Sequence, residues 1–200
     1  YATLQAAFTA AQANETITML DDIVLSERIF VKNEKVTLDL AGKKIEWNTA
    51  VSNGAGVLIV CRDADLTIND SSESSTGLID AKGIAAAAIS LTHGEDPKNS
   101  QTDLPAKLTV NGGTLKGRYY AISGNGLRPN TVITINGGTL EGTSSVVGNE
   151  GAGIYHPQVG TLTINGGTIQ GDTGLYIKSG DCICSIGSEA TIIATGTKKD

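Results

Sequence analysis

The sequence is short of aromatic and charged residues and has no long apolar run. Of its 200 residues, 4% are aromatic and 18% are charged, whereas 40% are hydrophobic. Any core must therefore be aliphatic, and the composition is that of a folded chain rather than a disordered one. No apolar stretch reaches the roughly 18 residues of a membrane span, so we expect no membrane insertion. The net charge of -6 opposes contact with phosphates and excludes nucleic acid as a partner.

The chain also lacks a secretory signal peptide and an even number of cysteines. It begins at Tyr1 rather than Met, and we expect it to be a fragment of a larger protein. Three cysteines fit no disulfide framework. Cys182 and Cys184 alternate along a predicted strand, a spacing that rarely forms a bridge, and Cys61 is far from both in the sequence. We expect three buried free thiols.

What the sequence does contain is an internal repeat. LTVNGGTLKG at residues 108–117 returns as ITINGGTLEG at 133–142 and as LTINGGTIQG at 162–171. The repeated asparagines of these copies are 25 and 29 positions apart (111 to 136, then 136 to 165). Weaker copies are predicted at 36–39, 66–69 and 190–193. The longer gap after the copy at 66–69 predicts a loop insertion at 93–105.

Each copy predicts two short strands joined by a sharp corner. Apolar residues two apart face one side of a strand, the threonine between them faces the other, and Asn-Gly-Gly is turn chemistry. A third strand is predicted in each unit, at 57–60, 88–91, 121–123, 153–155 and 175–178. No helical pattern interrupts these units. Three short strands per repeat indicate a solenoid of stacked coils, and exclude helical repeats and the longer blades of a propeller.

The sequence therefore predicts an all-β fold, a right-handed single-stranded parallel β-helix of about six or seven coils. We expect a single domain over residues 1–200, with coils at 16–194. Near the N-terminus, Leu4, Ala7, Phe8 and Ala11 fall at helical spacing. They predict a short capping helix within residues 1–15, whereas no equivalent cap is visible at the C-terminus.

The repeats, the N-terminal helix and the segments TITML (16–20) and VTLDLAGKKI (36–45) resemble the right-handed parallel β-helix of the pectate-lyase-like superfamily. The closest likeness is to repeat domains of large bacterial surface proteins, and it covers nearly the whole chain. The resemblance implies an extracellular or cell-surface location and a monomeric domain. It is weak for function, because that superfamily includes lyases, hydrolases, epimerases and adhesins.

Two polar columns are predicted to run along the solenoid. Asparagines at the corner should stack and hydrogen-bond as a structural ladder: Asn69, Asn111, Asn136 and Asn165. Threonines should form an outward column: Thr37, Thr67, Thr109, Thr134 and Thr163. One threonine per coil matches the preference of an exposed strand for β-branched residues and does not match the paired arrays of an ice-binding surface.

The third strands predict an exposed row of tyrosines. If Ile154 and Leu175 face the core, Tyr155 and Tyr176 face outward in adjacent coils, and the same phase puts Tyr119 outward and Tyr120 inward. The candidate ligand-binding residues are Tyr119, Tyr155 and Tyr176, with Arg118, Lys178 and His156 beside them. Such a row suits sugar rings, and the resemblance implies that a ligand lies along a strand face. The alternative explanation is that stacked tyrosines only stabilise the sheet.

Catalytic motifs are less evident. Enzymes of the superfamily use acidic calcium clusters with an arginine, or three aspartates with Gly-His-Gly. Here Asp21 and Asp22 adjoin the cap, and His93-Gly94 lacks the preceding glycine. The arginines have no obvious acidic partner in sequence: Arg28, Arg62, Arg118 and Arg128. Asp63, Asp65 and Asp70 are weak candidates for calcium ligands, with an acidic solvent-exposed turn as the alternative. We expect no other cofactor.

These observations favour a non-catalytic extracellular adhesion or glycan-binding module of a bacterial surface protein. Its partner would be a polysaccharide, a cell-surface glycan or a protein receptor. One alternative is a polysaccharide lyase or glycoside hydrolase acting on acidic polysaccharide, with catalytic residues in loops. Another is an architectural stalk that spaces other domains.

Overall fold

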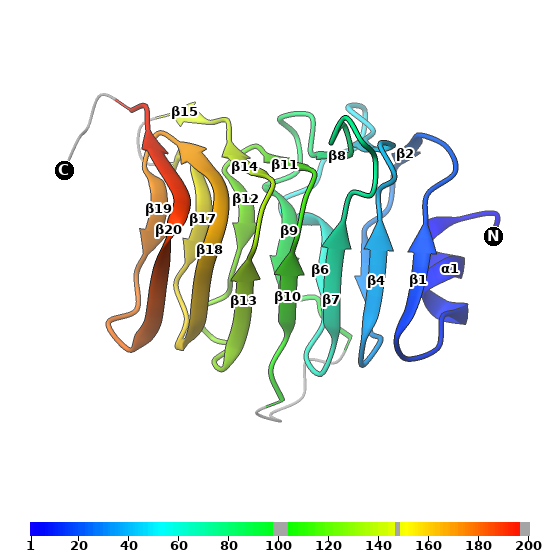
Figure 1. The fold of residues 1–200 in the computed structure, drawn as a ribbon, viewed down its shortest axis with the longest axis horizontal. Helices are drawn as coiled ribbons and strands as arrows, with labels where there is room; N and C mark the ends of the chain where they lie inside the picture. The colour runs from blue at the N-terminus through cyan, green and yellow to red at the C-terminus, as the bar shows by residue number, and fades with distance from the viewer. Residues whose placement is uncertain (98–103, 147–148, 197–200) are drawn as a thin grey trace.

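The protein folds into a parallel β-helix, seen from the side in Figure 1. This computed structural model describes residues 1–97, 104–146 and 149–196. Each turn of the chain places strands on three faces, and each strand pairs in parallel with its counterpart one coil away. Six such coils precede a final long strand, which confirms the predicted all-β solenoid of six or seven coils.

The strands are grouped by face. The first face contains β1 (Glu15–Thr18), β4 (Val36–Asp39), β7 (Asp65–Asn69), β10 (Lys107–Val110) and β13 (Thr131–Ile135). The second face contains β2 (Ile23–Leu25), β5 (Lys44–Trp47), β8 (Leu78–Asp80), β11 (Thr114–Gly117) and β14 (Thr139–Gly142). Two long strands, β18 (Gly160–Gly171) and β20 (Cys182–Ala194), run through both of these faces.

The third face is a separate sheet of six strands. It contains β3 (Ile29–Val31), β6 (Gly56–Val60), β9 (Ala87–Leu91), β12 (Tyr120–Ser123), β17 (Ala152–His156) and β19 (Gly174–Ile177). A small antiparallel pair, β15 (Ser145–Val146) and β16 (Asn149–Glu150), lies between β14 and β17 in the chain.

Apolar residues at matched positions form one continuous aliphatic core. On the first face, the register stacks buried residues directly above one another: Val36, Leu66, Leu108, Ile133 and Leu162. The threonines between them occupy a second, half-buried column: Thr37, Thr67, Thr109, Thr134 and Thr163. The period-2 pattern of each copy thus separates core from surface, as strand alternation requires.

At the corner between the first and second faces, the four repeated asparagines are hydrogen-bonded in series. The Nδ2 atom of Asn111 donates to Oδ1 of Asn69 at 2.8 Å, and Asn136 donates to Asn111 at 2.7 Å. Asn165 donates to Asn136 at 2.8 Å. Each interior member therefore both donates and accepts, and the ladder joins the corners of four coils.

Replacing Asn136 by alanine should destabilise the protein about twice as much as replacing Asn165. Asn136 takes part in two ladder bonds, whereas Asn165 is at the end of the series and makes one. At about 0.5–1.5 kcal/mol for each bond, we expect a loss of about 1–3 kcal/mol for Asn136→Ala. Urea denaturation followed by circular dichroism measures both variants. Equal losses would show that the ladder bonds do not set the stability of the corner.

The N-terminal end of the solenoid is covered by the helix α1 (Leu4–Ala10), as predicted. Thr3 begins the helix and accepts a bond from the backbone of Ala6 at 3.1 Å. The Gln5 side chain binds the exposed edge of β3, donating to the Phe30 carbonyl and accepting from its N–H at 2.9 Å. An amide side chain here replaces the backbone of a neighbouring strand, so the helix protects a sheet edge as well as the core.

The opposite end is the least covered part of the described chain. In β20, four isoleucines are 71%, 53%, 39% and 38% exposed: Ile183, Ile186, Ile192 and Ile193. The register places Ile186 beside Ile164 and Ile192 beside Ile169, both fully buried. These two side chains therefore occupy core columns and are exposed because no described coil covers them.

The register of β20 also corrects the last repeat. Ile192 pairs with Ile169, so residues 190–193 repeat the second strand of the unit rather than the first. The copy of Leu162 is Cys184. All three cysteines are free, but only Cys61 is buried, whereas Cys182 is half-buried and Cys184 exposed. The expectation of three buried thiols is thus wrong for the last coil.

The expected insertion at 93–105 falls between β9 and β10. Fifteen residues (92–106) connect these strands, whereas four (61–64) make the equivalent connection between β6 and β7. Residues 98–103 of the insertion lie outside the described part of the chain. Within the described residues, no helix is long and apolar enough to cross a membrane.

Candidate functional site

The third face departs from simple strand alternation in β6, β9 and β12. Two consecutive residues are buried there: Val57 and Leu58, Ala88 and Ile89, Ala121 and Ile122. The register skips the first residue of each pair. The residues on both sides of the pair are buried in β6 and β9, but in β12 they are only half-buried. In β12 these residues are Tyr120 and Ser123, which corrects the prediction that Tyr120 points inward.

Four tyrosines therefore form one row across three coils, here called the tyrosine row: Tyr119, Tyr120, Tyr155 and Tyr176. The ring centroids of Tyr119 and Tyr120 are 6.2 Å apart. Those of Tyr120 and Tyr155 are 4.7 Å apart with the planes only 19° from parallel. Those of Tyr155 and Tyr176 are 5.3 Å apart at 50°. Tyr155 and Tyr176 pair in register, so the row follows the axis of the solenoid.

The geometry decides what the row presents to a ligand. Tyr120 and Tyr155 cover each other's faces, so they present ring edges. Tyr176 is 44% exposed and ends the row. At the other end, the guanidinium carbon of Arg118 lies 5.1 Å from the centroid of the Tyr119 ring, within the range of a cation–π contact. The row can offer aromatic edges, phenol groups and one exposed ring.

Of the residues predicted beside the tyrosines, Lys178 lies on the surface and His156 in the interior. Lys178 is exposed and follows Tyr176 at the spacing that puts both on one side of a strand. His156 is fully buried, which corrects its prediction as a ligand-binding residue. The reason is the alternation of β17, because Ile154 and His156 face the interior and Tyr155 faces outward. Burial lowers the pKa of His156 below its ordinary value.

A hollow of about 430 Å³ adjoins the Tyr119 end of the row, and we call it the edge hollow. Its lining residues are Thr49, Ala50, Ser52, Asn53, Gly54, Ile84, Ala86, Arg118 and Tyr119. They come from three successive coils, in the connections that lead into β6, β9 and β12. The hollow thus lies where the second face turns into the third, and continues the surface of the tyrosine row.

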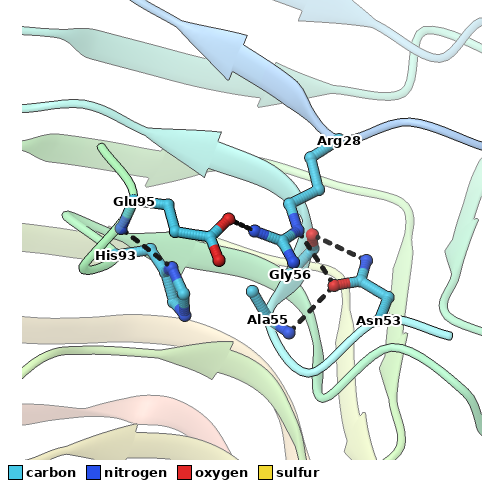
Figure 2. A network of polar contacts seen from close by, with 6 residues as sticks. All are labelled: Arg28, Asn53, Ala55, Gly56, His93 and Glu95. Atoms are coloured by element: carbon cyan, nitrogen blue, oxygen red, sulfur yellow. Dashed lines mark hydrogen bonds and ion pairs between the residues drawn. The ribbon is translucent and has the colours of Figure 1, made fainter. Parts of the chain in front are cut away.

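Beyond the edge hollow, a polar network extends over the start of the third face (Figure 2). Arg28 forms an ion pair with Glu95, and its Nε donates to Asn53 Oδ1 at 3.1 Å. Asn53 is itself held by the backbone of Ala55 and Gly56. The partner that the sequence did not reveal for Arg28 is therefore Glu95, 67 residues away in the insertion.

His93 closes this network. Its Nδ1 accepts from the backbone N–H of Glu95 at 3.3 Å, as Figure 2 shows. Burial, and secondarily the nearby Arg28, lower the pKa of His93. The network therefore holds the start of the insertion against the third face with a neutral histidine and a paired arginine.

The carboxylates considered for calcium do not converge. Asp65 begins β7, and Asp70 follows its other end. Burial raises the pKa of Asp70, but hydrogen bonds from the Ser72 hydroxyl at 2.8 Å and from the backbone of Gly77 at 2.6 Å and Gly42 at 2.8 Å outweigh it and hold the pKa below the ordinary value. Among the residues that the structure describes, no group of three or more His, Cys, Asp or Glu side chains is placed to hold a metal ion.

Two further acidic residues, of which Asp22 was named from the sequence, also have structural contacts. Asp22 accepts a bond from the backbone of Lys44 at 2.9 Å, next to the start of β5. Asp96 accepts a bond from the backbone of Arg62 at 3.0 Å. Partial burial raises the pKa of the Cys182 and Cys184 thiols, and at Cys182 the neighbouring Cys184 adds to the effect, which opposes formation of a nucleophilic thiolate.

Sequence reasoning missed Tyr120, the edge hollow and the Arg28–Glu95 pair. One sequence signal could have predicted that Tyr120 faces outward. Ala121 and Ile122 are consecutive apolar residues between two residues with hydroxyl groups, a pattern that indicates a change of phase in the strand. The other two features bring together residues from several coils.

Comparison with known proteins gives no relative. No family model, no curated protein and no solved structure matches the chain. The likeness to pectate-lyase-like repeat domains therefore stays a prediction from the sequence.

Proposed function

We propose that the chain is a non-catalytic glycan-binding module, displayed outside a bacterial cell, whose ligand lies along the tyrosine row. The observation that carries the proposal is the unbroken contact of four tyrosine rings across three coils, ending at the edge hollow. The extracellular location is supported by the sequence resemblance alone.

The chemistry of this surface supports a sugar ligand. Sugars combine apolar C–H faces with many hydroxyl groups, and tyrosine offers an apolar ring and a polar tip in one side chain. Tyr155 and Tyr176 repeat with the spacing of the coils, and Tyr120 extends the row to a third coil by stacking on Tyr155. A repeating surface of this kind suits a repeating polymer, because several units can make equivalent contacts.

An immobilised glycan panel tests the proposal. It should include acidic plant polysaccharides, neutral glucans and mucin glycans, probed with and without calcium. We expect selective binding by the native protein and at least about tenfold weaker binding by Tyr176→Ala, which removes the most exposed ring of the row. Thr134→Ala is the matched control, because Thr134 lies on the first face.

Three outcomes would contradict the proposal. A panel without any selective binding would favour a stalk or a protein-binding module. Release of shortened products would favour the lyase or hydrolase. Equal loss of binding in Tyr176→Ala and Thr134→Ala would place the ligand away from the tyrosine row. Circular dichroism of each variant must first match that of the native protein.

A further inference from the structure

The rim of the edge hollow carries a cation that has no counter-ion among the described residues. Elsewhere among the residues that the structure describes, Arg28 forms an ion pair with Glu95, Lys82 with Glu46 and Lys116 with Glu141. Arg118 forms no ion pair with a described carboxylate, although it lines the hollow. An arginine in this position can bind a planar anion through two parallel hydrogen bonds.

Arg118 is also held in place by an aromatic ring. Its guanidinium carbon lies 5.1 Å from the centroid of Tyr119, which is itself packed against Tyr120. A cation–π contact of this kind limits the rotamers of a long side chain. Less conformational entropy is therefore lost when the guanidinium binds an anion.

The remaining lining divides into apolar and hydroxyl-bearing parts. Ile84 and Ala86 are half-buried and contribute apolar surface, whereas Thr49 and Ser52 are exposed and bear hydroxyl groups. The volume of about 430 Å³ is within the range of small-molecule sites. Apolar surface, hydroxyl groups and the Arg118 cation together match a sugar ring that carries a negative charge.

We propose that the edge hollow binds an anionic sugar unit, with Arg118 as the counter-ion of its carboxylate or sulfate group. The inference rests on the proposed function, because it places one charged unit of the glycan at the end of the tyrosine row. It adds the ligand class, and it assigns discrimination between charged and neutral sugars to a single side chain.

The test compares one carboxylated oligosaccharide with its methyl ester, chosen from the acidic compounds that bind on the panel. Isothermal titration calorimetry measures both ligands. We expect the native protein to bind the free acid more tightly, and Arg118→Gln to weaken binding of the acid about tenfold more than binding of the ester. Arg118→Lys, which keeps the charge, should recover part of the loss.

Lys107→Gln is the matched control, since it removes one positive charge from an exposed position on the first face. It should not alter the preference for the acid. A sulfated oligosaccharide distinguishes the source of the negative charge, and binding that depends on Arg118 supports the inference in either case.

The results that overturn the inference differ from those that overturn the proposed function. If the native protein binds acid and ester equally, or if Arg118→Gln weakens both to the same extent, the hollow does not recognise the charge. In that case glycan binding itself can stand. If Tyr176→Ala leaves binding of both compounds unchanged, the tyrosine row is not the binding surface and the proposed function fails.

Discussion

Replacing Gly138 by alanine should lower the free energy of unfolding by more than about 3 kcal/mol. Gly138 is the second glycine of an Asn-Gly-Gly corner and has a φ of +86°. A Cβ atom at this position would lie 2.5 Å from the carbonyl oxygen of Gly113, one coil away. The obstructing atom is backbone, so the neighbouring coil would have to move.

The same relation recurs at Gly167, where a Cβ atom would lie 2.8 Å from the carbonyl oxygen of Gly138. The repeated glycines are therefore required both by the left-handed backbone and by the close stacking of successive corners.

Two further glycines separate these causes. Gly83 has a φ of +68°, and a Cβ atom added there would have no heavy atom within 4 Å, so Gly83→Ala should cost only about 1–2 kcal/mol for its conformation. Gly54 has neither a positive φ nor a close neighbour, and Gly54→Ala should be nearly neutral. Chemical denaturation ranks the three variants. Equal costs for Gly138→Ala and Gly83→Ala would show that coil stacking does not constrain the corner.

His156→Leu should increase stability at pH 7.5 by about 1–3 kcal/mol. His156 is fully buried, and neither ring nitrogen makes a hydrogen bond of good geometry with a described residue. Backbone groups of His156 and Gln158 oppose the lowering of its pKa, but burial outweighs them. A buried polar group without a partner is destabilising, and an apolar side chain of similar size removes that cost. Thermal or chemical denaturation measures the change. A variant less stable than the native protein would mean that the imidazole is satisfied, for instance by an internal water.

The same substitution should make the protein less sensitive to acid. Well above pH 6.5 the histidine is neutral in both states and contributes no pH dependence. Below that pH the unfolded chain binds a proton, whereas the lowered pKa keeps the histidine of the folded protein neutral. The free energy of unfolding therefore decreases as the pH is lowered, until the pH passes the pKa of the folded state. We expect a smaller loss between pH 7.5 and 5.5 for His156→Leu than for the native protein.

His93 is the comparison, because it is the other histidine of the chain and its pKa is also lowered. His93→Gln should remove a separate part of the acid sensitivity. If neither substitution alters the loss of stability between pH 7.5 and 5.5, the acid sensitivity does not come from the two histidines.

The coil architecture could be predicted because its determinants are local and repeated. Apolar residues two apart fix the inner side of each strand, and a corner that only glycine can form without strain recurs in three copies. Gln5 shows where this reasoning stops. The helical spacing predicted α1, but the side chain that binds the edge of β3 is recognisable only when Phe30 is beside it.

The candidate site was predicted less completely, because it depends on phase and on contacts between coils. One skipped position in β12 moved Tyr120 from the expected interior to the middle of the tyrosine row. For His156, named as a ligand-binding candidate, strict alternation alone would have predicted the interior, since outward Tyr155 requires its neighbour to face inward. The Arg28–Glu95 pair joins residues that no local pattern connects.

Tyrosine labelling tests most directly whether the third face is the glycan-binding surface. The native protein would be treated with tetranitromethane, with and without saturating amounts of the glycan selected on the panel, and each tyrosine quantified by peptide mass spectrometry. Tyr176 is 44% exposed in the row, and Tyr1 is 89% exposed and outside it, so Tyr1 is an internal reference. We expect the glycan to protect Tyr176 and leave Tyr1 unchanged. Equal modification of Tyr176 in the free and saturated protein would contradict binding along the tyrosine row.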